Sequence, residues 1–182
     1  MKSATMRDLV IVGVAMLSML PLGSNALAQH NFDETKKAWP DLRILAPDKI
    51  RTLSAPIKSD LSKRGCRIPM FTKWDGRHNV IRGSFRIAGS SDVAVLCYAD
   101  DEMSIIVYPD GRVANAEELR KLPANALRMI YVMSPFVLNK RAIRDKAVDK
   151  LPKFDHDAIE DGLIGGHAET TYYDKGVWHD VF

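Results

Sequence analysis

The chain has 182 residues, of which 27% are charged, and a formal net charge of +3. So near-neutral a balance gives no electrostatic argument for nucleic acid or anionic lipid, and no nucleic-acid partner is expected. The length suits one domain with its own hydrophobic core.

Residues 1–28 predict a secretory signal peptide. Lys2 and Arg7 give a basic start, and an apolar run of 14 residues follows from Leu9 to Leu22. A bilayer-spanning helix needs about 20 residues, so the run is too short, and the small residues up to Ala28 form a cleavage site. We expect cleavage after Ala28 and export to the periplasm or the medium, with no integral membrane anchor. A retained anchor helix is the alternative.

Residues 29–182 are predicted to form a single α+β domain. The expected architecture is a central antiparallel β-meander with flanking helices and a C-terminal β-hairpin. Residues 29–45 are mixed and polar, and they predict a loosely held arm. Without the leader the chain keeps 24 basic and 22 acidic side chains.

The segment after Pro47 predicts helical structure, because apolar residues recur at helical spacing. These positions are Ile50, Leu53, Ile57 and Leu61. Pro47 suits a first helical position, Pro56 kinks that helix or starts a second one, and Gly65 is expected to end it in a left-handed conformation.

The only two cysteines, Cys66 and Cys97, lie in the exported part and predict a disulfide. In the chain-entropy model this bond stabilises the fold by roughly 3–4 kcal/mol. It would tie the end of the helical region to the second strand of the meander, with the Cys97 sulfur on the face of Val93 and Val95. The alternative is a nucleophilic thiol paired with a histidine, which no local motif supports.

Three strands are predicted at 79–87, 92–98 and 103–108, and their short connectors favour antiparallel pairing. In the first strand, one face is expected to carry Ile81, Gly83, Phe85 and Ile87. The polar turn at 75–79 is expected to place His78 on the surface.

After a turn at 109–111, capping-box spacing predicts a short helix at 115–119. Residues 127–133 predict a fourth strand, and residues 134–150 a helix capped by Ser134 with Pro135 at its first position. The basic run 139–146 is interpreted as a solvated helix face.

The acidic cluster around Asp155 suggests a calcium loop, but an EF-hand counted from Asp155 lacks suitable residues at positions 5, 6 and 12. The interpretation favoured here is a short helix capped by Asp157 and Glu160 and ended by Gly165 and Gly166. No metal and no other cofactor is expected.

Catalytic motifs are incomplete. The tripeptide "HAE" at 167–169 matches half of the zinc deaminase signature, but no Pro-Cys-x-x-Cys follows it. H-E-x-x-H, G-x-S-x-G and Walker-type loops are absent from the sequence, so no catalytic residue is assigned.

A binding surface is predicted near the C-terminal end. Tyr172, Tyr173 and Trp178 gather in the expected hairpin, where alternation sends some side chains outward, and Asp155 and His156 are included with them. The alternative is that at least half of these aromatic side chains belong to the core.

The stretch "VIRGSFRIAGSSDVAVLCYADDEMSIIVY" (80–108) resembles small exported bacterial proteins of unknown function. Their core is similar to a single degenerate FG-GAP repeat, the unit of integrin-type propellers, and "DHDAIED" and "YYDKGVWHDV" resemble their tail. In the parent repeat an acidic loop binds calcium, whereas here only Asp92 matches an acidic position. The resemblance implies export and a strand meander, without calcium and without an activity.

The expected function is that of an exported, non-enzymatic binding or envelope-associated protein whose partner is an unknown protein or cell-envelope component. One alternative is a small exported hydrolase that uses distant carboxylates, His156 or His167. Another is a secreted enzyme inhibitor.

Overall fold

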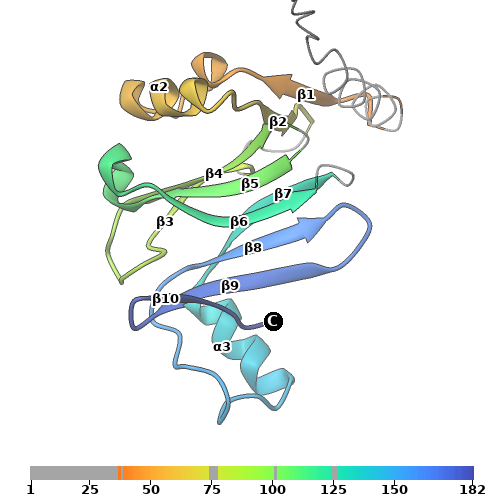
Figure 1. The fold of residues 1–182 in the computed structure, drawn as a ribbon. Helices are drawn as coiled ribbons and strands as arrows, with labels where there is room; N and C mark the ends of the chain where they lie inside the picture. Colours follow the sequence, from red (N-terminus) through yellow and green to blue (C-terminus); the bar gives the residue numbers. More distant parts are fainter. Residues whose placement is uncertain (1–36, 38, 74–77, 101, 124–126) are drawn as a thin grey trace, which may run out of the picture.

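The computed structural model describes residues 37, 39–73, 78–100, 102–123 and 127–182. The predicted leader, its cleavage site after Ala28 and most of the predicted arm lie outside these ranges. The predicted α+β class is confirmed, because antiparallel sheets combine with the helices α2 (Ala55–Lys63) and α3 (Pro135–Arg144) in the described ranges. The elements stack in layers, with α2 at one end and α3 at the other (Figure 1).

The central sheet contains four strands that are antiparallel neighbours in chain order. They are β3 (Val80–Gly83), β4 (Asp92–Ala99), β5 (Glu102–Tyr108) and β6 (Glu117–Pro123). Strand β4 is apolar on both faces, so it is buried along almost its whole length. The sheet therefore needs a covering layer on each side.

One face of the central sheet is covered by the N-terminal elements. Strand β1 (Leu42–Leu45) pairs with β2 (Ile68–Phe71), and a 3-10 turn at Pro47–Lys49 precedes helix α2 (Ala55–Lys63). The predicted arm is therefore wrong for residues 42–45, since they form β1 and bury Leu42. The helical segment predicted after Pro47 is two separate elements in the structure, the 3-10 turn at Pro47–Lys49 and α2.

The disulfide between Cys66 and Cys97 is confirmed, with the two Cα atoms 5.2 Å apart. Gly65 ends α2 with φ +69°, and the Cys66 amide donates to the carbonyl of Leu61, which closes the last turn. Both cysteines share a core cluster with Val93 and Val95. The bond thus joins α2 to the central sheet, although the opposite face of β4 is buried as well.

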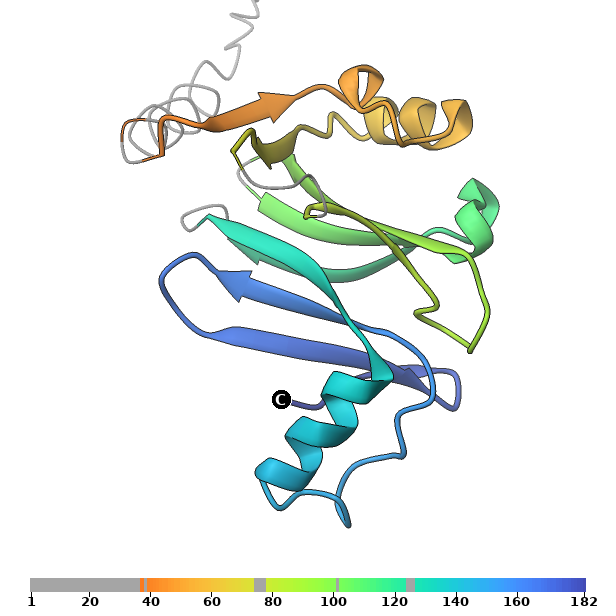
Figure 2. The ribbon, with the colours of Figure 1, turned by 180° about the vertical axis from the view of Figure 1, so that it is seen from behind.

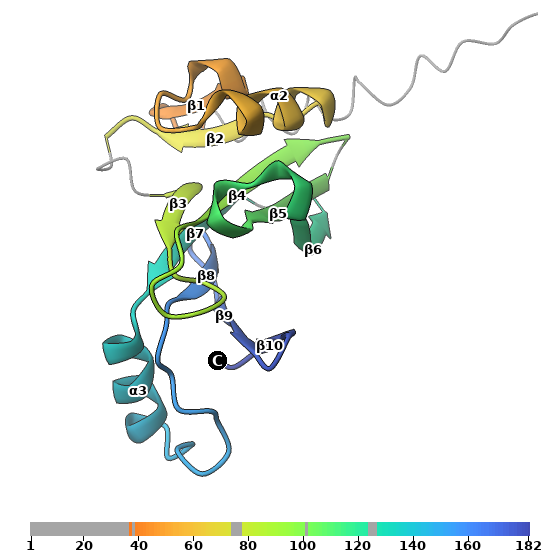
Figure 3. The same cartoon turned by 90° about the vertical axis from the view of Figure 1, so that its left-hand side faces the viewer.

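The other face packs on a second antiparallel sheet, in the order β10-β9-β8-β7 (Figure 2). Its strands are β7 (Arg128–Met133), β8 (Ala158–Leu163), β9 (Ala168–Asp174) and β10 (Val177–Asp180). Ile130 and Ile159 from this sheet pack against Leu96 and Ile105 of the central sheet. Helix α3 (Pro135–Arg144) forms the outermost layer (Figure 3).

Two predicted helices are strands in the structure. The helix at 115–119 is wrong, because Glu117 and Glu118 pair with β5 and extend the central sheet. The capped helix near Asp157 is wrong too, because neighbouring Ala158 and Ile159 are buried on opposite faces of β8. The Asp157 carboxylate instead accepts from the amide of Ser84 at 2.9 Å. Pairing with distant strands overrides the local capping pattern in both places.

Three further expectations need correction. The strand predicted at 127–133 runs from Arg128 to Met133 but belongs to the second sheet, and the helix from Pro135 ends at Arg144 rather than at 150. Lys146 has φ +53° there, and the Ala147 amide closes the helix end on the carbonyl of Ala142. The strand predicted at 79–87 ends at Gly83, and Ile87 lies beyond it, 66% exposed, instead of sharing a strand face with buried Ile81.

His78 and Asn79 form a buried polar junction, so the expectation of a surface His78 is wrong. His78 Nε2 accepts a hydrogen bond from the Phe71 amide at 2.9 Å. Asn79 is fully buried, and its side chain donates to the carbonyl of Pro69 and accepts from the amide of Ile130. These bonds connect the β1–β2 ribbon with both larger sheets.

Candidate functional site

The five residues of the predicted binding surface separate into two clusters on opposite faces of the second sheet. Neighbouring residues of a strand point to opposite faces, so Tyr172 and Tyr173 of β9 diverge. Tyr172 packs beneath α3 with Asp155 and His156, whereas Tyr173 contacts Trp178 on the side of the central sheet. The five residues therefore do not form one surface, and the burial of Tyr172 fits the alternative that part of the aromatic group belongs to the core.

The first cluster is a hydrogen-bonded triangle. His156 Nδ1 lies 2.6 Å from Asp155 Oδ1, and the Tyr172 hydroxyl donates to the same oxygen at 3.0 Å. The rings of His156 and Tyr172 stack at 4.3 Å, and Phe154 meets Tyr172 edge-on at 4.8 Å. Tyr172 and His156 are buried, while the Asp155 side chain is 72% exposed.

Burial raises the pKa of Tyr172 to about 12, because the phenolate form would lose its hydration. The hydrogen bond from His156, with a further one from Tyr172, lowers the pKa of Asp155 because both favour its ionised form. A carboxylate also orients the histidine of a general base, but there the second ring nitrogen must reach the substrate. Nε2 of His156 is buried without a hydrogen-bond partner in the described part of the chain, so the geometry favours a structural role.

The second cluster packs between the two large sheets. Tyr173 and Trp178 meet edge-on at 5.0 Å, and Arg86 donates to the Tyr173 hydroxyl at 2.7 Å. The Trp178 indole donates to Glu117 of β6 at 3.0 Å, and Arg86 lies 3.4 Å from the same glutamate. The aromatic side chains thus stabilise a seam between the sheets and are half-buried there.

An ion-pair network that the sequence did not predict continues this seam. Arg128 donates to the buried carboxylate of Asp161 at 2.7 Å, and Arg120 of β6 lies 3.8 Å from its other oxygen. Arg120 also pairs with Glu169 and Asp180. The signal in the sequence is a charged residue at an inward-facing strand position, which becomes visible only once the strand pairing is known.

The carboxylate of Asp92 accepts hydrogen bonds from donors of the same chain. Its Oδ2 accepts from the amides of Phe85 and Arg86 and from the Ser90 hydroxyl, at 2.7–3.0 Å. Its Oδ1 accepts from the Asp110 amide at 2.9 Å. The carboxylate therefore organises the loop after β3 by accepting these four hydrogen bonds.

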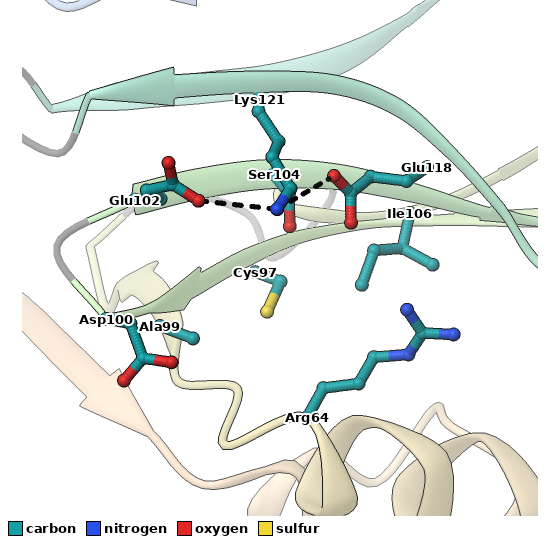
Figure 4. A pocket seen from close by; sticks show the side chains of 9 residues that line it. All are labelled: Arg64, Cys97, Ala99, Asp100, Glu102, Ser104, Ile106, Glu118 and Lys121. Carbon is teal, nitrogen blue, oxygen red and sulfur yellow. Dashed lines mark ion pairs between the residues drawn. The ribbon is translucent and has the colours of Figure 1, made fainter.

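A small cavity of about 150 Å³ lies beside the disulfide (Figure 4). Cys97 of β4 and Arg64 from the end of α2 line it, and Lys121 lies between Glu102 and Glu118 at 3.4 and 3.5 Å. Ligand pockets usually measure about 300–1,000 Å³. The cavity is smaller than this range, and its lysine is already paired with two carboxylates.

The described residues contain no group of three or more histidine, cysteine, aspartate or glutamate side chains able to hold a metal ion. His167 is exposed in the turn between β8 and β9, so it and buried His156 occupy different environments. Within the same ranges, no helix is long and apolar enough to cross a membrane.

Helix α3 is held firmly by its inward face. Leu138 and Ala142 are buried against the second sheet, and Asn139 donates to the Phe154 carbonyl at 2.8 Å. Arg141 points inward as well, donating to Glu160 of β8 at 3.0 Å. The Asp155–His156–Tyr172 triangle lies next to these contacts and fixes the segment on which α3 rests.

The outward face of α3 is apolar and basic. Phe136 and Ile143 are each 67% exposed, and Val137 is 42% exposed. Lys140 lies between them, with its Nζ 4.3 Å from the centre of the Phe136 ring. The positive charge of this segment is expected from its sequence, whereas the exposed apolar side chains that repeat at helical spacing on the same side were not predicted.

No family model, curated protein or solved structure matches the chain. The site must therefore be interpreted from its own chemistry.

Proposed function

We propose that this protein is an exported, non-enzymatic binding protein associated with the cell envelope. The observation that carries the proposal is the α3 surface, defined as the outward face of α3 together with residues 145–150. A helix whose inward face is fixed by packing and hydrogen bonds holds its outward side chains in place, which lowers the entropic cost of binding.

Export is supported by the predicted leader and by the disulfide, because structural disulfides persist in oxidising compartments. The resemblance to small exported bacterial proteins supports the same location. In the proposed architecture a central meander, β3 to β6, and a C-terminal hairpin, β9 and β10, form a rigid platform beneath α3.

Fractionation of a Gram-negative host that produces the full-length chain tests the proposal. We expect a periplasmic or envelope-bound product that begins at Gln29 and has a mass two hydrogens below that of its reduced form. A cytoplasmic product that keeps residues 1–28 and two alkylatable thiols would refute export.

Binding to isolated envelopes tests the surface itself. We expect sedimentation with envelopes to decrease in the variant Phe136→Ser/Ile143→Ser. The matched control is Ile87→Ser, since Ile87 is 66% exposed but lies in the loop after β3. Equal sedimentation of the wild type and the double variant would contradict the assignment of binding to α3.

A further inference from the structure

Exposed apolar side chains concentrate around α3. In the described ranges seven large apolar residues are exposed, and five of them lie between Val132 and Val148. They are Val132, Val137 and Val148 together with Phe136 and Ile143. Single exposed apolar residues are ordinary, but a group of this kind marks an interaction surface.

The same segment carries the excess charge of the protein. Residues 135–150 contain five basic and two acidic side chains, an excess equal to the formal net charge of +3 of the whole chain. Arg141 is turned inward to Glu160, whereas Lys140, Lys146 and Lys150 are exposed. The near-neutral overall balance therefore conceals one positively charged end.

This combination distinguishes a lipid surface from a protein partner. The cores of protein–protein interfaces are depleted in lysine. Interfacial helices instead combine apolar residues, which enter the headgroup region, with lysines that meet anionic lipid. Lys140 directly beside Phe136 fits the second pattern, since the ring can enter the headgroup layer while the ammonium group stays near a phosphate.

The position of the helix suits a flat partner. Figure 3 places α3 at one end of the molecule, beyond the second sheet. Phe136, Lys140 and Ile143 follow one another at helical spacing, on the side opposite buried Leu138 and Ala142. The outward side chains can therefore contact a planar surface together.

We propose that the α3 surface docks onto a bilayer containing anionic phospholipids. Phe136 and Ile143 enter the headgroup region, and Lys140, Lys146 and Lys150 lie against lipid phosphates. This inference rests on the proposed envelope association and names the component that is bound.

Vesicle flotation tests the docking with the purified, disulfide-bonded protein. We expect binding to vesicles of phosphatidylglycerol and phosphatidylcholine and much weaker binding to phosphatidylcholine alone. Raising the salt from about 0.1 M to about 1 M shortens the screening length from about 10 Å to about 3 Å, so binding should weaken. Equal binding to both vesicle types would overturn the proposal.

Variants separate the contribution of the lysine charges to vesicle binding from that of the apolar side chains. A lysine near an anionic membrane strengthens binding about fivefold, so Lys140→Gln/Lys146→Gln should weaken binding about 25-fold. Phe136→Ser/Ile143→Ser should weaken it more than about tenfold, whereas Ile87→Ser should bind like the wild type. Both α3 variants should keep the wild-type melting temperature, because the substituted side chains are exposed. Binding by Phe136→Ser/Ile143→Ser at the wild-type level would overturn the proposal.

The envelope assay distinguishes the two levels of the proposal. If the wild type ignores anionic vesicles but still needs Phe136 and Ile143 to sediment with envelopes, lipid docking is refuted and envelope association stands. If Phe136→Ser/Ile143→Ser sediments with envelopes like the wild type and the wild type does not bind vesicles, both lipid docking and envelope binding through α3 are refuted.

Discussion

Asn79 is the residue whose loss should affect the fold most directly, because its hydrogen bonds connect three strands from different sheets. Its Nδ2 donates to the Pro69 carbonyl of β2 at 2.5 Å, and its Oδ1 accepts from the Ile130 amide of β7 at 3.0 Å. Its own carbonyl accepts from the Leu96 amide of β4 at 2.9 Å. The substitution Asn79→Ala removes the two side-chain hydrogen bonds and leaves the two hydrogen bonds of the Asn79 backbone.

The loss of stability in Asn79→Ala can be worked out from the two backbone groups that lose their hydrogen-bond partners and from the strain at residue 79. A buried carbonyl and a buried amide lose their partners, each at a cost of about 1–3 kcal/mol. Asn79 has φ +62°, a left-handed conformation that asparagine tolerates, whereas alanine adds about 1 kcal/mol of strain. We therefore expect the free energy of unfolding to fall by about 3–7 kcal/mol, a large part of the roughly 5–15 kcal/mol typical of a domain.

Urea unfolding followed by circular dichroism and by tryptophan fluorescence measures this change. Asn79→Gly is the matched control, because it loses the same two bonds without the backbone strain. Its free energy of unfolding should be about 1 kcal/mol above that of Asn79→Ala. A loss below about 1 kcal/mol for Asn79→Ala, or a glycine variant less stable than the alanine variant, would refute the reasoning.

Three further predictions concern the Cys66–Cys97 disulfide, the buried Tyr172 and the ion pair between Arg128 and Asp161. Refolding under reducing conditions should lower the free energy of unfolding of the wild type by about 3–4 kcal/mol, while Cys66→Ala/Cys97→Ala, which lacks the bond, should be insensitive to reductant. The pKa of Tyr172 is about 12 in the folded protein and about 10 in the unfolded chain. The free energy of unfolding should therefore fall as the pH rises from about 10 to about 12, and it should fall less steeply in Tyr172→Phe. Urea titrations of both proteins at several pH values test this. Arg128→Leu should cost about 3–5 kcal/mol by leaving the Asp161 carboxylate buried without its closest partner, and adding Asp161→Leu should restore most of it in thermal denaturation. An equally unstable double variant would argue against an uncompensated charge.

Several features follow from the sequence alone, because they depend on neighbouring residues or on residue type. The runs of β-branched and other apolar residues at 92–98 and 103–108 specify strands, and Gly65 specifies the end of α2. The pairing of Cys66 with Cys97 followed because only two cysteines exist. Ser134 and Pro135 likewise marked the start of α3.

Tertiary structure decided the remainder, because those features depend on contacts between distant residues. Capping patterns near Glu118 and Asp157 predicted helices, yet pairing with β5, and with β7 and β9, made both segments strands. Neighbouring side chains of β9 point to opposite faces, so Tyr172 and Tyr173 lie on different sides of the second sheet. The local sequence pattern does not show which of these faces packs on the central sheet. His78 was predicted on the surface and is buried, since its acceptor nitrogen serves the backbone of β2. The positive charge around α3 was evident in the sequence, but only packing of its inward face left the apolar side chains exposed beside the lysines.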